Sequence, residues 1–154
     1  MAVRRTFPEP AMLAIENAIK RSEISHQGEI RLAVEAALGT PALLKGQTGR
    51  ERAVEVFSHL RVWDTEQNNG VLIYLLLADH HVEIVADRGV NARVKNDEWE
   101  SICRKMESSF AQGQFESGVI AGIEAIGEHL QEHFPTRNEG GENELPNRPV
   151  ILGE

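Results

Sequence analysis

Hydrophobic positions in the first part of the chain change from a helical to an extended spacing. Over residues 8–25 they recur every three or four positions, which predicts an amphipathic helix. From Gly28 onward they alternate with polar positions, and Ile30, Leu32 and Val34 fall on one side. This second pattern predicts a strand with one face buried and the other exposed to solvent.

A second helix is predicted after a short loop. Residues 39–46 combine glycine and proline and predict a connection without regular structure. Thr48 and Glu51 have the spacing of a capping box, in which each side chain bonds the backbone N–H of the other residue. We therefore expect a helix that begins at Thr48 and ends near Trp63.

The middle of the chain has the strongest strand signals. Residues 71–78 form an uninterrupted apolar run, as in a central strand that is covered on both faces. Residues 82–86 alternate again, and Asp79 and His80 separate the two runs. The two segments therefore predict an antiparallel hairpin.

Two more helices are predicted before the chain becomes polar. Asn96 is placed to cap the first, which ends at Gly113, and Pro135 stops the second, which runs from Phe115 to Phe134. A strand joined to the next through a helix forms a parallel pair, and a hairpin adds an antiparallel neighbour. The predicted fold class is α/β, a three-layer α/β/α sandwich with a small mixed β-sheet flanked by helices.

The predicted organisation is a single α/β domain over residues 1–134, followed by a flexible C-terminal tail over residues 135–154. The tail is rich in Gly, Asn, Glu and Pro, and it ends in an apolar patch at residues 149–152. Three outcomes are open for this patch. It adds as a strand to a sheet edge of this chain or of a partner, folds back on its own domain, or stays mobile.

Charge and composition exclude several classes of protein. The 154 residues carry a net charge of −8, which disfavours binding to nucleic acid. The longest apolar run, residues 71–78, is far shorter than the roughly 20 residues of a membrane-spanning helix. The N-terminus lacks the apolar core of a secretory signal, and a single cysteine fits a reducing compartment. We therefore expect a cytoplasmic protein without membrane insertion.

Few residues point to covalent catalysis, and the residues alone leave open whether the protein is an enzyme. Cys103 falls on the apolar stripe of a predicted helix, which favours a buried, inert thiol. Gly118, Gly122 and Gly127 share one face of the last helix, which favours close helix packing over a phosphate loop. The chain contains no Walker sequence, no GxSxG elbow and no HExxH pair.

Three segments of the chain resemble the TPM domain family. They are NNGVL at the entry to the central strand, DRGV after the hairpin, and GQFESG at the start of the last helix. The resemblance covers residues 28–134 and implies an α/β/α sandwich. That family includes thylakoid lumen proteins linked to photosystem repair and many bacterial proteins of unassigned role. We expect a short bacterial form without a signal peptide or a membrane anchor.

One candidate cation site lies at the base of the hairpin. Asp87 follows the second strand near the point where the first begins, so it should approach Asn68, Asn69 and either Asp64 or Glu66. Carboxylate and amide oxygens suit a hard cation such as Ca²⁺ or Mg²⁺, and the family resemblance implies such an ion. In the alternative, structural interpretation, the two asparagines turn the chain and Asp87 pairs with an arginine.

A second candidate metal site lies at the hairpin turn. Asp79, His80 and His81 combine a carboxylate with two imidazoles, which are ligands of transition metals. An exposed polar turn explains the same residues. A strand of about 26 Å, at about 3.3 Å per residue, separates Asp79 from Asp87, so the two candidates are distinct sites.

Two functions follow from these residues and the resemblance. The first is a binding or interaction module that holds a divalent cation and binds an unidentified protein partner. Because some relatives are anchored in membranes, the resemblance implies that this partner is membrane-associated. The second is a weak divalent-dependent acid phosphatase-type phosphomonoester hydrolase, in which Asp87 holds the cation and Arg88 steadies the phosphate. Gly89 is predicted to permit a left-handed or closely packed backbone beside them.

Overall fold

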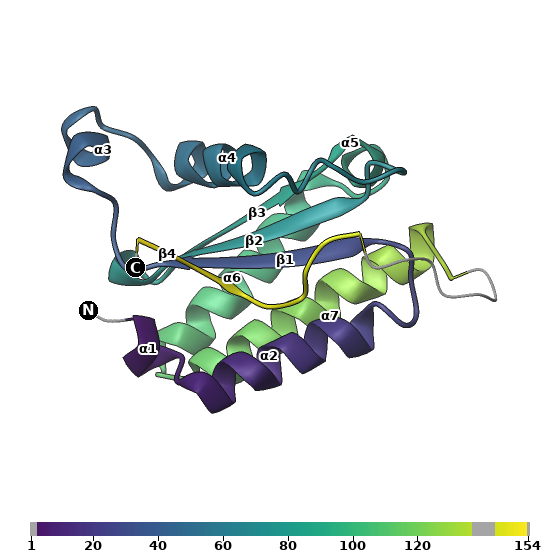
Figure 1. Ribbon diagram of the computed structural model, residues 1–154, viewed down its shortest axis with the longest axis horizontal. Coiled ribbons are helices and arrows are strands. Elements are labelled where there is room, and N and C mark those ends of the chain that lie inside the picture. Colours follow the sequence, from purple (N-terminus) through teal and green to yellow (C-terminus); the bar gives the residue numbers. More distant parts are fainter. Residues whose placement is uncertain (1–2, 137–143, 154) are drawn as a thin grey trace.

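The computed structural model describes residues 3–136 and 144–153, which form a sheet between two groups of helices (Figure 1). In chain order the elements are α1 (Val3–Thr6), α2 (Glu9–Ser22), β1 (Glu29–Glu35), α3 (Thr40–Leu44), α4 (Gly49–His59), β2 (Gly70–Leu76), the 3-10 turn η1 (Leu77–Asp79), β3 (His81–Ala86), α5 (Arg88–Asn91), α6 (Asn96–Ala111), α7 (Phe115–His133) and β4 (Val150–Leu152).

The sheet is mixed and has the strand order β3-β2-β1-β4. β1 pairs with β2 in parallel, with Ala33 opposite Tyr74, and β2 pairs with β3 in antiparallel fashion, with Ile73 opposite Ile84. Every residue of β2 is buried, as its unbroken apolar run predicts. The predicted α/β class, the parallel pair and the hairpin are therefore confirmed.

Helices α2, α6 and α7 pack together on one face of the sheet and enclose the larger hydrophobic core (Figure 1). Each helix contributes several buried side chains to this core. Examples are Ile15 of α2, Phe110 of α6 and Ile123 of α7. A Cβ atom on Gly118 of α7 would lie 2.8 Å from the Cβ atom of Ser109 in α6, so glycine permits the close helix packing that was predicted. None of the described helices is long and apolar enough to cross a membrane.

Helix α4 covers the opposite face of the sheet over a smaller core (Figure 1). Its predicted capping box is present: the Glu51 N–H donates to Thr48 Oγ1 at 3.1 Å, and the Thr48 N–H donates to Glu51 Oε1 at 3.0 Å. Ala53 and Val56 of this helix belong to the same core as Tyr74 of β2. The capped start of α4 therefore fixes how the crossover from β1 to β2 lies on the sheet.

Local predictions differ from the structure at several places. Residues 40–44 form the short helix α3 inside the segment that was predicted to be a loop. Helix α4 ends at His59, and Trp63 lies in the turn that follows. Helix α6 begins at Asn96 itself, so the capping position belongs to Lys95, and the predicted Asn96 cap is wrong.

Strand β1 is covered on both faces, whereas its alternating pattern predicted one exposed face. Its first and last residues, Glu29 and Glu35, are only 3% and 9% exposed. Glu35 accepts hydrogen bonds from Arg52 Nε at 2.8 Å and from the Tyr74 hydroxyl at 2.6 Å. The two glutamates of β1 are therefore buried and Glu35 has specific partners, which alternation alone does not reveal.

The end of the chain forms the fourth strand of the sheet. Residues 150–152 pair in parallel with β1, with Ala33 opposite Val150, and Leu145 is buried. The free edge of β1 supplies backbone groups that a flexible tail would leave to water. Of the three outcomes left open for this patch, the structure shows strand addition within the chain. Residues 137–143 of the predicted tail lie outside the described residues.

Candidate functional site

The turn before β2 and the segment after β3 meet at one end of the sheet. The Asp87 N–H donates to the Gly70 carbonyl, and the Gly89 N–H donates to the Asn68 carbonyl, each at 2.9 Å. These bonds bring the backbones of Asn68, Asn69 and Asp87 together, as the hairpin predicted. Metal binding by these residues stays a prediction.

Local geometry explains the residue types at this junction. Asn68 has a φ of +52°, in the left-handed region that asparagine tolerates better than most residues. A Cβ atom on Gly89 would lie 2.6 Å from the carbonyl oxygens of Gln67 and Asn68, so only glycine fits against the turn. Asp87 precedes α5, and its Oδ1 accepts the Arg88 N–H at 2.8 Å. Gly89 therefore allows the close packing of the two segments.

Two side-chain oxygens at this junction are buried and have no hydrogen-bond partner among the residues that the structure describes. They are Oδ1 of Asn69 and Oδ2 of Asp87. The amide of Asn69 is fully buried and oriented by its Nδ2, which donates to the Gln27 carbonyl at 3.0 Å. A buried oxygen without a donor costs free energy unless water or a ligand satisfies it. Each of these two atoms is therefore open to water or a ligand.

The chemistry of these oxygens favours a hard cation. Calcium accepts carboxylate, amide and backbone oxygens together with water. Of the two acids considered as further ligands, the Asp64 carboxylate pairs with Arg61 at 3.0 Å, whereas Glu66 makes its contact through the backbone N–H, which donates to the Glu144 carboxylate at 3.0 Å. Across residues 3–136 and 144–153, no group of three or more His, Cys, Asp or Glu side chains could hold a metal. A cation site here would therefore combine one carboxylate with neutral oxygens.

The hairpin turn does not gather its polar side chains at one point. His80 has a φ of +50°, and its ring packs edge-on against the ring of Phe115 in α7, with ring centroids 5.5 Å apart. The ring nitrogens of His81 instead contact Glu83 at 3.0 Å and Glu107 at 3.2 Å. Carboxylates thus occupy both nitrogens of His81, and the set Asp79, His80 and His81 does not form a common ligand point.

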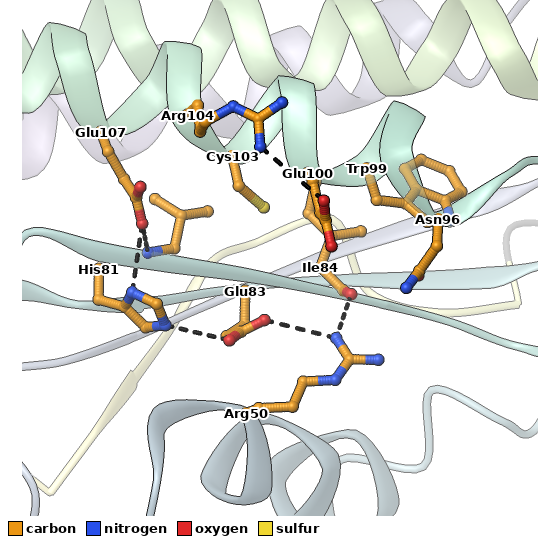
Figure 2. A pocket seen from close by; sticks show the side chains of 11 residues that line it. Arg50, His81, Glu83, Ile84, Asn96, Trp99, Glu100, Cys103, Arg104 and Glu107 are labelled. Atoms are coloured by element: carbon orange, nitrogen blue, oxygen red, sulfur yellow. Dashed lines mark hydrogen bonds and ion pairs between the residues drawn. The ribbon is translucent and has the colours of Figure 1, made fainter.

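A groove of about 410 Å³ runs along the outer edge of β3, between α4 and α6 (Figure 2). Arg50 donates to the Ile84 carbonyl at 2.6 Å, and the Glu107 carboxylate accepts the Val82 N–H at 3.0 Å. Alternate residues of an antiparallel strand direct these backbone groups away from the neighbouring strand. The side chains therefore cap the free edge of β3, which blunts it against pairing with another strand.

Cys103 faces this groove, and its environment makes the thiol unreactive. Burial raises its pKa to about 12, and the charges of Glu83 and Glu107 contribute. Because the thiolate is the nucleophile, this shift supports the inert thiol predicted from the helix stripe. The edge-capping charges at Arg50, Glu83 and Glu107 were not predicted. The polar residues His81 and Glu83, at alternate positions of β3, were the sequence signal that could have indicated this edge.

The sequence also did not predict a pair of carboxyl groups beside the Asn69 turn, of which Glu29 is buried and Glu23 half-buried. Glu23 follows α2, Glu29 begins β1, and their side chains share a hydrogen bond. Burial, together with the charge of Glu29, raises the pKa of Glu23 to about 9, and burial also raises the pKa of Glu29. The Glu29 N–H donates to the Asn69 carbonyl at 3.2 Å, so the pair adjoins the candidate cation site.

Comparison with known proteins identifies the fold and its family. The family model of the TPM domain matches residues 6–129. The chain belongs to the TPM domain family. This TPM domain is similar to the BA42 protein from the psychrophilic bacterium Bizionia argentinensis, with 31% identity over 97% of this chain and 98% of that one, and a TM-score of 0.83.

Two further solution structures share the fold of this TPM domain. An N-terminal domain from P. gingivalis is 18% identical over 86% of this chain and 83% of its own, with a TM-score of 0.67. An N-terminal domain from Corynebacterium glutamicum is 12% identical over 88% and 80%, with a TM-score of 0.60. At these identities the two structures show the fold alone. No curated protein sequence matches this chain.

Proposed function

We propose that this TPM domain is a binding module that holds a hard divalent cation where residues 67–70 meet residues 86–89. Two buried oxygens that have no hydrogen-bond partner among the described residues carry the proposal: Asn69 Oδ1 and Asp87 Oδ2, on segments joined by backbone hydrogen bonds. A cation that binds both oxygens would compensate their burial. It would also fix the surface beside it, where Asn68 and Arg88 are exposed and available to a protein partner.

The surroundings favour a cation over an anion at this place. The chain carries a net charge of −8, which favours cations over anions near its surface. Neutral amide and backbone oxygens suit Ca²⁺ better than Mg²⁺, which is smaller and gives up its water reluctantly. Because the site offers one carboxylate, we expect a dissociation constant on the order of 10⁻⁴ to 10⁻³ M for calcium.

An NMR titration of the amide signals tests the proposal. Chelator-treated protein receives Ca²⁺, Mg²⁺ or Zn²⁺ in separate samples. Calcium should produce saturable shifts confined to residues 64–70 and 86–91, with His80 and His81 unchanged. Saturable shifts at His80 and His81 under zinc alone would move the site to the hairpin turn. The absence of saturable shifts with all three ions would refute the cation site.

The same samples test phosphomonoester hydrolysis, the alternative function. Here Asp87 would hold the cation and the exposed Arg88 would steady the phosphoryl group. Hydrolysis of p-nitrophenyl phosphate that is lost in a folded Asp87→Asn variant would support this activity. A lack of turnover with all three ions would remove the hydrolase and leave the binding module.

A further inference from the structure

The segment 144–152, here called the strap, runs along the edge of β1 and ends in β4 (Figure 1). The pairing extends only from Ala33 opposite Val150 to Glu35 opposite Leu152. Three paired residues make a short strand, at the lower limit of what sheets contain. The strap therefore depends on contacts outside β4.

Two side chains of β1, which we call the clamp, hold the strap by its backbone. The Glu29 carboxylate accepts two consecutive N–H groups at the start of the strap, the second from Leu145 at 3.1 Å. The Arg31 guanidinium donates to the carbonyls of Pro146 and Arg148, at 2.9 and 2.8 Å. The clamp thus recognises an extended chain by its backbone groups, as strand-accepting edges do.

Two strap side chains add specificity to this recognition. Leu145 is 7% exposed and joins the core beneath α4. Arg148 pairs with Glu9 of α2 at 3.0 Å and lies 3.9 Å from Glu16. The site therefore selects an apolar residue followed, three positions later, by a positively charged one.

We propose that the β1 edge with its clamp accepts the strap of a second copy of this chain in place of its own. Every contact of the docked strap involves groups that an identical strap from another copy also carries, which is the condition for segment exchange. The strap contributes two buried side chains, Leu145 and Pro149, so its release exposes fewer buried groups than the release of a helix such as α7. The chain's own strap is tethered and has a high effective concentration, which favours the closed monomer in dilute solution.

Two complementary full-length variants test the exchange. Leu145→Asp disables the strap and keeps the clamp, whereas Arg31→Glu disables the clamp and keeps the strap. Each variant alone should be monomeric by size-exclusion chromatography with light scattering. Their equimolar mixture should contain a species of twice the monomer mass, because one intact strap can dock on one intact clamp. Its amount should rise with protein concentration.

A second pair keeps the test decisive if Leu145→Asp does not fold. Ile151→Pro removes a backbone N–H from the half-buried β4 and leaves the core residue Leu145 in place. Dimer in the mixture of Ile151→Pro with Arg31→Glu would support the exchange. Monomer in this mixture at every concentration, from variants whose circular dichroism spectra match the wild type, would overturn it. The outcome does not depend on whether the domain binds a cation.

Discussion

The pKa values of acidic side chains shift in opposite directions at the two ends of the sheet. At the end where β1 and β2 finish, burial alone would raise the pKa of Glu35, but hydrogen bonds from Arg52 and Tyr74 hold it below its ordinary value. At the end where these strands begin, burial and mutual repulsion raise the pKa of Glu23, and burial raises that of Glu29. Glu35 is thus a carboxylate paired with an arginine, whereas Glu23 at the other end keeps its proton at neutral pH.

The hairpin repeats this contrast. Near its turn, both ring nitrogens of His81 contact carboxylates, and the edge groups of Val82 and Ile84 are capped by side chains. At its other end, Asn69 Oδ1 and Asp87 Oδ2 are buried without a partner among the described residues. At the turn these polar groups have partners, whereas at the other end the two buried oxygens have no hydrogen-bond donor among the described residues. This difference is why we place the cation beside Asp87.

Removing the arginine at the neutralised end should have the largest effect. Arg52→Met would leave the Glu35 carboxylate buried without its cationic partner, which should lower the free energy of unfolding by about 3 kcal/mol. Urea denaturation at neutral pH measures this loss. The double variant Arg52→Met/Glu35→Gln should recover most of the stability, because no buried charge remains. A double variant as unstable as Arg52→Met would contradict the role given to the ion pair.

At the opposite end, replacing the ionisable side chain of Glu23 should stabilise the protein. Between pH 4.5 and about 9 the folded protein holds a proton on Glu23 that the unfolded chain releases, so wild-type stability should fall as pH rises through this window. Glu23→Gln removes this dependence and keeps an acceptor for the Ile30 N–H. Allowing for solvent screening of a half-buried group, we expect a Tm higher by about 3–6 °C at pH 8.

The same variant should match the wild type near pH 4, where Glu23 is protonated in both states. Calorimetric melting of both proteins at pH 4, 6 and 8 provides the comparison. A Tm difference that stays constant across these values would show that Glu23 does not retain its proton on folding.

The smallest effect should come from the hairpin turn. His81→Gln removes a contact to one carboxylate and keeps an amide that can bond the other, at a site that is partly exposed. We expect a loss of about 0.5–1 kcal/mol in urea denaturation, the size typical of partly exposed side-chain contacts. Calcium binding should be unaffected, because the residue lies at the far end of β3 from Asp87. Weaker calcium binding by this variant would contradict the assignment of the two ends.

Periodicity predicted most of the fold because each pattern is a local property of its element. The apolar run at residues 71–78 and the capping box at Thr48 specify a central strand and a helix start without reference to the rest of the chain. The sequence left three outcomes open for residues 149–152, because the composition of the tail is that of a flexible segment. Its pairing depends on the edge that β1 leaves free and on the clamp residues Glu29 and Arg31.

The candidate site was predictable where it follows from the hairpin and hidden where it depends on packing. A hairpin requires the residues after its second strand to return to the start of its first, which placed Asp87 beside Asn69. Alternation shows on which side of β1 Glu29 lies, but not that the 144–145 segment and Glu23 cover that side. The contact of Glu107 with His81 joins α6 to β3, and no local pattern contains it.

Isothermal calorimetry of calcium binding to Asp87→Asn and to the matched control Asp79→Asn tests the central claim most directly. The two variants lose the same charge at opposite ends of β3. We expect Asp87→Asn to weaken calcium binding at least tenfold, about 1.4 kcal/mol, and Asp79→Asn to bind like the wild type. Equal affinities for both variants and the wild type, with all three folded, would contradict a cation site at Asp87.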